Sequence, residues 1–115
     1  MRPIRVDLKQ DNVEPHAWQL TITGDLDMTT IGAFDEAVDS LVAQGARLVV
    51  LDLGSVAFLD STGLRGIVRA SDALAEKHGQ LTVAGLSGAA ERVLEVTGLL
   101  ERLRHEPSTT PKDRA

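Results

Sequence analysis

The chain contains no cysteine, which excludes disulfides and thiolate metal sites and fits a reducing compartment. Aromatic residues make up only 3% of the sequence, so the core must be built from Leu, Val, Ile and Ala. No apolar run approaches the roughly 20 residues of a membrane span. Residues 1–10 carry charge without the apolar centre of a secretory signal. We therefore expect a cytoplasmic protein with no membrane contact.

Positive charge is also scarce. Twelve Lys and Arg stand against 17 Asp and Glu, giving a net charge of −5, and the basic residues are scattered along the chain. Nucleic-acid-binding domains present a basic patch or stripe, so we expect no nucleic-acid partner. A chain of 115 residues is long enough for one domain with a single core. We predict a domain over residues 1–106 and a disordered polar tail over 107–115.

Apolar residues alternate with polar ones over residues 4–9 and again over 18–23, the period typical of half-buried strands. Turn-forming residues 11–15 lie between them, so these segments predict an antiparallel hairpin. Residues 48–53 are almost continuously apolar, which predicts a strand covered on both faces. Residues 81–84 predict one more short strand.

Helical periodicity appears in three segments, residues 31–42, 64–78 and 90–97. Thr29 or Thr30 is the expected N-cap of the first helix, and Ser87 that of the third. A glycine is expected to stop each helix, namely Gly45, Gly79 and Gly98. The order is therefore β-β-α-β-α-β-α. Since strand–helix–strand units form right-handed parallel crossovers, we predict an α/β fold with a small mixed sheet.

Polar residues cluster after two of the predicted strands, in residues 24–27 (GDLD) and 58–63 (FLDSTG). We expect both segments to be strand-to-helix loops. Working sites of open α/β sheets lie beyond the carboxyl ends of the strands, so the loops converge if their strands run in the same direction. Asp60 or Ser61 would then stand at a helix N-terminus, where unpaired N–H groups favour a negative charge. The simplest role for either residue is that of N-cap.

Residues of these types occur in three kinds of catalytic or ligand site. A magnesium or phospho-aspartyl site could use the carboxylates of Asp25, Asp27, Asp52 and Asp60. Such a site needs several converging carboxylates and a steadying lysine, and no lysine lies at a predicted strand end. A serine hydrolase needs a histidine base and a G-x-S-x-G turn. The segment 59–63 (LDSTG) lacks the first glycine.

The three histidines lie in a hairpin turn, at the far end of a helix and near the tail, so none is placed to activate Ser61. A phosphate-cradling loop needs several glycines with a lysine, and no lysine stands between Gly54 and Gly63. We therefore expect no catalytic residue, no metal and no cofactor. A hydroxyl without a catalytic partner is better suited to receiving a chemical group than to performing a reaction.

Three segments of the chain resemble the STAS domains, specifically the bacterial anti-sigma factor antagonists. Residues 24–27 resemble the family's G-E-L-D loop, with Asp25 in place of Glu. Residues 51–53 and 56–64 resemble its phosphorylation segment, and residues 83–85 and 98–99 its last strand and helix end. The resemblance covers about residues 4–104. It implies a mixed sheet with helices mainly on one face.

The resemblance also implies roles for single residues. Ser61 matches the serine that a partner kinase phosphorylates, with Thr62 as the less favoured acceptor, and Asp27 matches an acidic residue near the kinase's nucleotide. Many relatives carry a small residue where this chain has Arg65, so the arginine is expected to alter partner choice or to contact the phosphate. The expected partner-binding residues are Asp25, Asp27, Asp60, Thr62, Gly63, Leu64 and Arg65.

By this resemblance, the unphosphorylated domain binds an anti-sigma factor of the histidine-kinase-like ATPase type and thereby frees a sigma factor. Phosphorylation of Ser61 ends the interaction, and a serine phosphatase restores it. The competing interpretation is a scaffold or regulatory subunit, in which the same fold docks protein partners without being phosphorylated.

Overall fold

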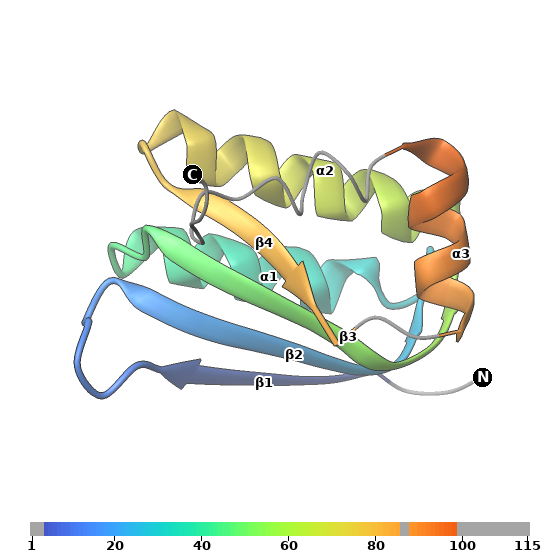
Figure 1. Cartoon of the computed structure of the whole chain (residues 1–115), viewed down its shortest axis with the longest axis horizontal. Coiled ribbons are helices and arrows are strands. Elements are labelled where there is room, and N and C mark those ends of the chain that lie inside the picture. The colour runs from blue at the N-terminus through green and yellow to red at the C-terminus, as the bar shows by residue number, and fades with distance from the viewer. Residues whose placement is uncertain (1–3, 86–87, 99–115) are drawn as a thin grey trace, which may run out of the picture.

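The computed structural model describes residues 4–85 and 88–98 of the chain (Figure 1). The predicted order β-β-α-β-α-β-α is confirmed. The elements are β1 (Arg5–Gln10), β2 (Ala17–Leu26), α1 (Ile31–Ala43), β3 (Leu48–Leu59), α2 (Ser61–Glu76), β4 (Gln80–Ala84) and α3 (Gly88–Thr97). Ser87 and the tail from residue 107, for which we predicted a helix cap and disorder, lie outside the described residues.

The strands form one mixed sheet in the order β1-β2-β3-β4. The predicted hairpin pairs β1 with β2 in antiparallel fashion, from Arg5 opposite Thr23 to Gln10 opposite Trp18. The pairs β2–β3 and β3–β4 are parallel. A parallel pair needs a crossover connection, and α1 and α2 supply the two crossovers. The mixed sheet expected from the sequence is therefore confirmed.

Both crossover helices pack on the same face of the sheet, α1 against β1 and β2, and α2 against β3 and β4 (Figure 1). The expected placement of the helices mainly on one face is confirmed. α3 packs against β3 through the buried Leu94. Full burial of a Leu, Ile or Phe side chain stabilises the fold by about 1.5–3 kcal/mol. The largest fully buried side chains are those of Leu20, Ile22, Leu26, Phe34, Leu41, Leu51, Leu53, Ile67, Leu74 and Leu94.

The opposite face of the sheet is open, which corrects the prediction that residues 48–53 are covered on both faces. Val49, Leu51 and Leu53 are buried under the helices. The alternate side chains of Leu48 and Val50 are 44% and 37% exposed. A strand with apolar residues on its outward-facing side has the same continuous apolar pattern as a strand covered on both faces. The sequence pattern therefore could not distinguish the two cases.

Both strands that lead to the site are longer than their sequence patterns predicted. Gly24 to Leu26 are the last residues of β2 and pair with Val56 to Leu59 of β3. The pairing absorbs register shifts between Thr21 and Thr23 and between Gly24 and Asp25. Such bulges bend a strand without ending it. The expected loops 24–27 and 58–63 are therefore wrong in extent, and only residues 27–30 and Asp60 connect strand to helix.

The helix ends also differ in detail from the predictions. Gly45 and Gly98 follow α1 and α3 with positive φ angles of 88° and 79°, which confirms them as stops. α2 ends at Glu76 rather than at residue 78. His78 takes the left-handed conformation at φ 63°, in place of Gly79. Gly79 is needed for another reason, because a Cβ there would lie 2.7 Å from the carbonyl oxygen of Arg47.

Candidate functional site

The N-terminus of α2 divides two tasks between neighbouring side chains. Asp60 is the N-cap, with its Oδ1 accepting a hydrogen bond from the Gly63 N–H at 2.9 Å. Its carbonyl accepts from the Leu64 N–H at 2.9 Å. Ser61 is the first helical residue and is exposed, and its hydroxyl makes no hydrogen bond to the described part of the chain. Because Asp60 caps the helix, the hydroxyl of Ser61 is not needed as a cap and remains exposed to solvent.

The ends of β2 and β3 meet at this helix start. Leu26 pairs with Leu59, and the Asp60 N–H donates to the Leu26 carbonyl at 3.4 Å. Gly63 packs against the same carbonyl so closely that a Cβ there would overlap the oxygen. The predicted convergence of residues 24–27 with residues 58–63 is therefore confirmed. Asp25 and Asp27 flank Leu26, and Asp60 and Ser61 follow Leu59.

Asp27 organises the short connection between β2 and α1. Its Oδ1 accepts from the Thr29 hydroxyl at 2.7 Å and from the Thr29 N–H at 2.9 Å. The hydroxyl bond, followed by the backbone bond, lowers the pKa of the Asp27 carboxyl below its ordinary value. These hydrogen bonds from Thr29 favour the ionised carboxylate and hold the half-buried Asp27 side chain in a fixed position.

Thr30 secures the same connection from inside, although the sequence indicated it only as a possible helix cap. Its side chain is 6% exposed and makes no capping bond to α1. The hydroxyl donates to the Asp25 carbonyl at 2.8 Å and accepts from the Asp27 N–H at 3.0 Å. A threonine close after an acidic strand end fits both roles equally, so the pattern could not distinguish them.

Arg65 and Arg69 lie on the exposed side of α2 but in different surroundings. Arg69 of α2 contacts Asp39 of α1 at 2.9 Å and Asp35 at 3.5 Å. The hydrogen bond to Asp39 raises the pKa of its guanidinium. Arg65 is exposed and makes no ion pair within residues 4–85 and 88–98.

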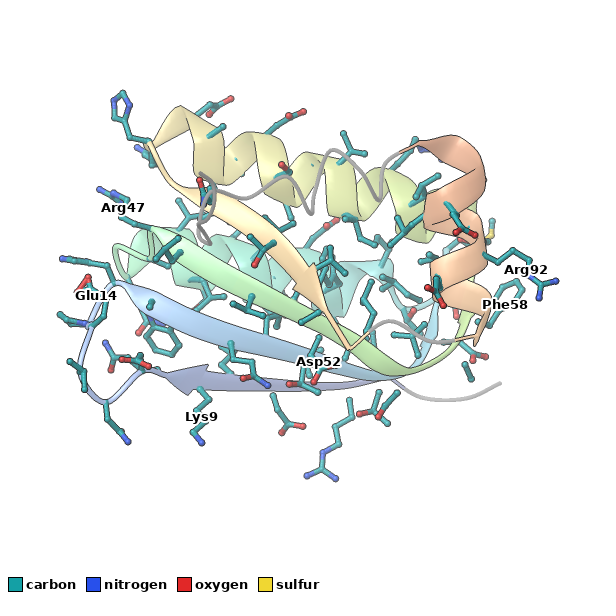
Figure 2. All side chains as sticks on the ribbon, in the orientation of Figure 1. Lys9, Glu14, Arg47, Asp52, Phe58 and Arg92 are labelled. Atoms are coloured by element: carbon teal, nitrogen blue, oxygen red, sulfur yellow. The ribbon has the colours of Figure 1, made fainter. Side chains whose placement is uncertain are left out.

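Two large apolar side chains are exposed near this end of the sheet, and the sequence analysis did not single them out as binding residues. Met28 is 71% exposed and Phe58 49% exposed. Phe58 lies at the end of the molecule where α3 packs, near Arg92 in the view of Figure 2, whereas Glu14 and Arg47 lie at the opposite end. Phe58 and Leu59 are adjacent large apolar residues of one strand, so only one of them can face the core, which was the available signal.

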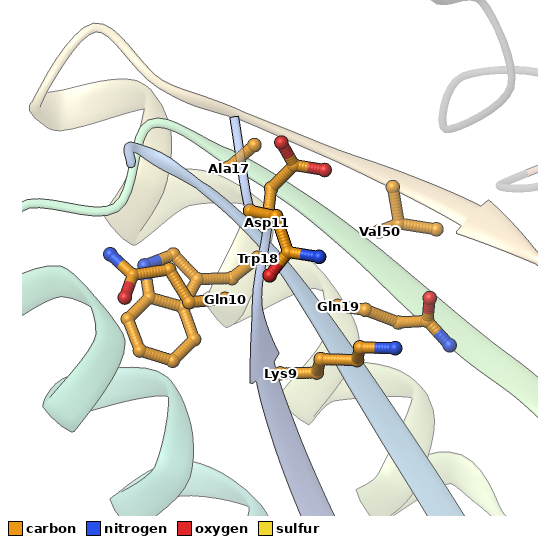
Figure 3. A pocket seen from close by; sticks show the side chains of 8 residues that line it. Lys9, Gln10, Asp11, Ala17, Trp18, Gln19 and Val50 are labelled. Carbon is orange, nitrogen blue, oxygen red and sulfur yellow. The ribbon is translucent and has the colours of Figure 1, made fainter. Parts of the chain in front are cut away.

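Two hollows of the surface are lined by described residues. One, of about 520 Å³, runs along the outer side of α2. It is lined by Arg65, Val68, Arg69, Asp72, Ala73 and Glu76. The other, of about 260 Å³, lies at the hairpin end, where Lys9, Gln19 and Val50 line its wall (Figure 3). The first hollow begins one helical turn from Ser61, and the second lies at the other end of the strands.

Among the described residues, no side chains are grouped as the catalytic and metal sites considered above would require. His16 contacts the Gly45 carbonyl at 3.2 Å and His78 follows the end of α2, both far from Ser61. Asp52 lies on the open face of β3 (Figure 2), where it accepts from the Gly54 N–H at 2.9 Å. No three His, Cys, Asp or Glu residues among 4–85 and 88–98 are grouped to hold a metal ion. In the same residues, no helix is long and apolar enough to cross a membrane.

Comparisons with known proteins agree on one family. The family model of the STAS domain matches residues 9–111. An anti-sigma-B factor antagonist of Staphylococcus aureus is 28% identical over 92 residues, which are 80% of this chain and 85% of that protein.

Solved structures give the same result. An anti-sigma factor antagonist from Mycobacterium paratuberculosis superposes with a TM-score of 0.75 at 26% identity, over 88% of this chain and 82% of the other. The Bacillus cell fate determinant SpoIIAA in its phosphorylated form gives a TM-score of 0.67 at 18% identity, over 87% and 88% of the two chains.

Proposed function

The chain belongs to the STAS domain family, and from this premise we propose that it is an anti-sigma factor antagonist switched by phosphorylation. Unphosphorylated, it binds an anti-sigma factor of the histidine-kinase-like ATPase type, which then releases its sigma factor. The bound anti-sigma factor phosphorylates Ser61 and the complex dissociates. A serine phosphatase removes the phosphate and restores binding. This cycle uses ATP and releases a sigma factor, so it takes place in the cytoplasm.

The state of Ser61 is the observation that carries the proposal. Its hydroxyl is exposed on the first residue of α2 while Asp60 provides the cap, so adding a group to Ser61 breaks no hydrogen bond among the described residues. No described histidine stands near enough to act as its base, which supports a substrate role over a nucleophilic one. Names of similar proteins support the same proposal, since S. aureus has an anti-sigma-B factor antagonist and SpoIIAA is known in phosphorylated form.

The transfer step uses groups from both proteins. The Ser61 oxygen forms a bond to the γ-phosphorus of ATP, the bond from that phosphorus to the β–γ bridging oxygen breaks, and ADP leaves. The hydroxyl proton passes to a base of the kinase. The role of this chain is to hold the hydroxyl at a fixed, exposed position.

Phosphorylation weakens binding through charge and hydration. A phosphoserine carries a charge of about −1.5 to −2 and three acceptor oxygens. The N-terminus of α2 favours such a charge, so the fold tolerates it. At an interface the same group must lose its hydration beside Asp60 and near Asp25 and Asp27. A loss of about 3 kcal/mol would weaken binding roughly 150-fold.

The partner surface surrounds the acceptor. Met28 and Phe58 offer exposed apolar area at the same end of the sheet, and large side chains of this kind anchor protein interfaces. Asp27, ionised and fixed by Thr29, supplies charge for the kinase or its nucleotide-bound surface. We propose Asp25, Asp60, Thr62, Gly63, Leu64 and Arg65 as further contacts because they border Ser61.

The test is phosphorylation in vitro by the cognate kinase with ATP, with the modified residue mapped by mass spectrometry. Ser61→Ala should fold normally and take up no phosphate, while the matched Thr62→Ala should be phosphorylated like the original chain. Uptake by Ser61→Ala at the original rate would move the acceptor to Thr62. If the partner binds but neither the original chain nor either variant is phosphorylated, the chain is a docking scaffold, and the proposed regulation by phosphorylation is wrong.

A further inference from the structure

Arg65 stands four residues after Ser61, and its charge makes no ion pair with the described residues. Residues four apart lie on the same side of a helix, about 6 Å apart along its axis at 1.5 Å per residue. The side chain is exposed and has no ion-pair partner within the described residues. Arg69, one turn further along the same side, is held by Asp39 and Asp35 of α1.

A phosphate on Ser61 would enter an acidic neighbourhood. Asp60 precedes it directly, and Asp25 and Asp27 flank the paired Leu26. Since the Asp60 carboxylate already accepts from the Gly63 N–H, that N–H is not available to the new group. A cation would offset the charge of the phosphate beside these acids. Arg65 is on the same side of the helix, and no carboxylate of the described residues contacts it. A guanidinium presents paired N–H donors that match two phosphate oxygens.

We propose that Arg65 binds the phosphate of phosphorylated Ser61 within the same helix. The inference rests on the proposed function, because it concerns the phosphorylated state of that site. Its consequence is regulatory. Pairing holds the phosphate along the outer side of α2, offsets part of its charge against the neighbouring acids, and withdraws Arg65 from the hollow that it lines with Val68 and Arg69.

The experiment installs phosphoserine at position 61 of the full chain by genetic encoding, so it needs no kinase. The second ionisation of the phosphate is followed by phosphorus NMR between pH 4 and 8. We compare the original chain with Arg65→Gln and with Arg69→Gln, which removes the same charge one turn away. Arg65→Gln should raise the phosphate pKa by about 0.2–0.7 units. Arg69→Gln should change it by less than about 0.1 units, because that charge is about 12 Å from Ser61 along the helix and exceeds the screening length.

The outcomes separate this inference from the proposed function. Equal shifts in the two variants, or no shift in either, would overturn it. Arg65→Lys should restore part of the shift, and thermal melting of each protein checks that the fold persists. If Arg65→Gln leaves the phosphate unchanged but weakens kinase binding by the unphosphorylated chain, Arg65 is a partner contact and the inference is wrong. Failure of the kinase to modify Ser61 would instead overturn the proposed function and leave this measurement intact.

Discussion

At the scale of single residues, Asp60 and Ser61 make distinguishable contributions. Asp60 caps α2 through the Gly63 N–H, so Asp60→Ala should lower the free energy of unfolding by about 1 kcal/mol, within the 0.5–2 kcal/mol range for lost N-caps. Ser61→Ala removes no hydrogen bond of the described fold and should change stability by less than about 0.5 kcal/mol. Urea unfolding of both variants measures the difference. A larger loss in Ser61→Ala would mean that the serine, not the aspartate, is the cap.

The ionisation of Asp27 gives a second prediction at this scale. Hydrogen bonds from Thr29 lower the pKa of Asp27 in the folded protein. Its contribution to stability is therefore present above the pKa of the unfolded chain and is lost as the pH falls through the folded value. NMR titration of the carboxyl should show the lowered pKa, and Thr29→Ala should raise it toward the ordinary value. An unchanged pKa in Thr29→Ala would exclude these hydrogen bonds as the cause.

At the scale of helices and strands, Gly63 fixes the spacing between α2 and β2. A Cβ at Gly63 would overlap the Leu26 carbonyl and lie 2.7 Å from Leu59 Cδ1. The carbonyl is backbone and cannot turn aside, so Gly63→Ala should cost about 1–3 kcal/mol. Gly32 is the matched control, because nothing lies within 4 Å of its added Cβ. Gly32→Ala should be neutral or stabilise α1 by up to about 1 kcal/mol.

Thermal melting and kinase binding of the two variants test this account together. Gly63→Ala should melt lower and bind the kinase more weakly, because the strand ends that carry Asp27 and Ser61 move apart. Gly32→Ala should bind as the original chain does. Equal stability of the two variants would show that the contact at Leu26 is not fixed.

Periodicity predicted every described helix and strand. The general topology of open α/β sheets predicted that the segments 24–27 and 58–63 converge if their strands run in the same direction. Periodicity failed where a property is not local. The end of β2 depends on its pairing with β3 across register shifts. These shifts cannot be predicted from the residue pattern of either strand alone. The exposure of Leu48 and Val50 depends on which face the helices cover. The role of Thr30 depends on carbonyls that converge only after folding. These features need the tertiary structure.

At the scale of the whole molecule, the core is built between the helices and one face of the sheet, from residues that the structure describes. Residues 107–115 contain no apolar residue larger than alanine apart from proline. A truncation after Glu106 should therefore leave the melting temperature and kinase binding unchanged. Calorimetry of the shortened and full chains measures both. A clear drop in either would show that the tail docks on the domain.

The contact between the Asp60 N–H and the Leu26 carbonyl joins segments that are far apart in the sequence. Parallel strands are joined by a crossover connection and not by a tight turn, so this contact is present only in the folded domain. An unfolded chain, or one still being synthesised, therefore has Ser61 in its sequence but not the surface that surrounds it. A kinase that requires this surface would bind only folded molecules. Under the proposed function, the amount of sigma factor released would then depend on the number of folded copies in the cell. Damaged copies that lack this surface would be neither bound nor phosphorylated.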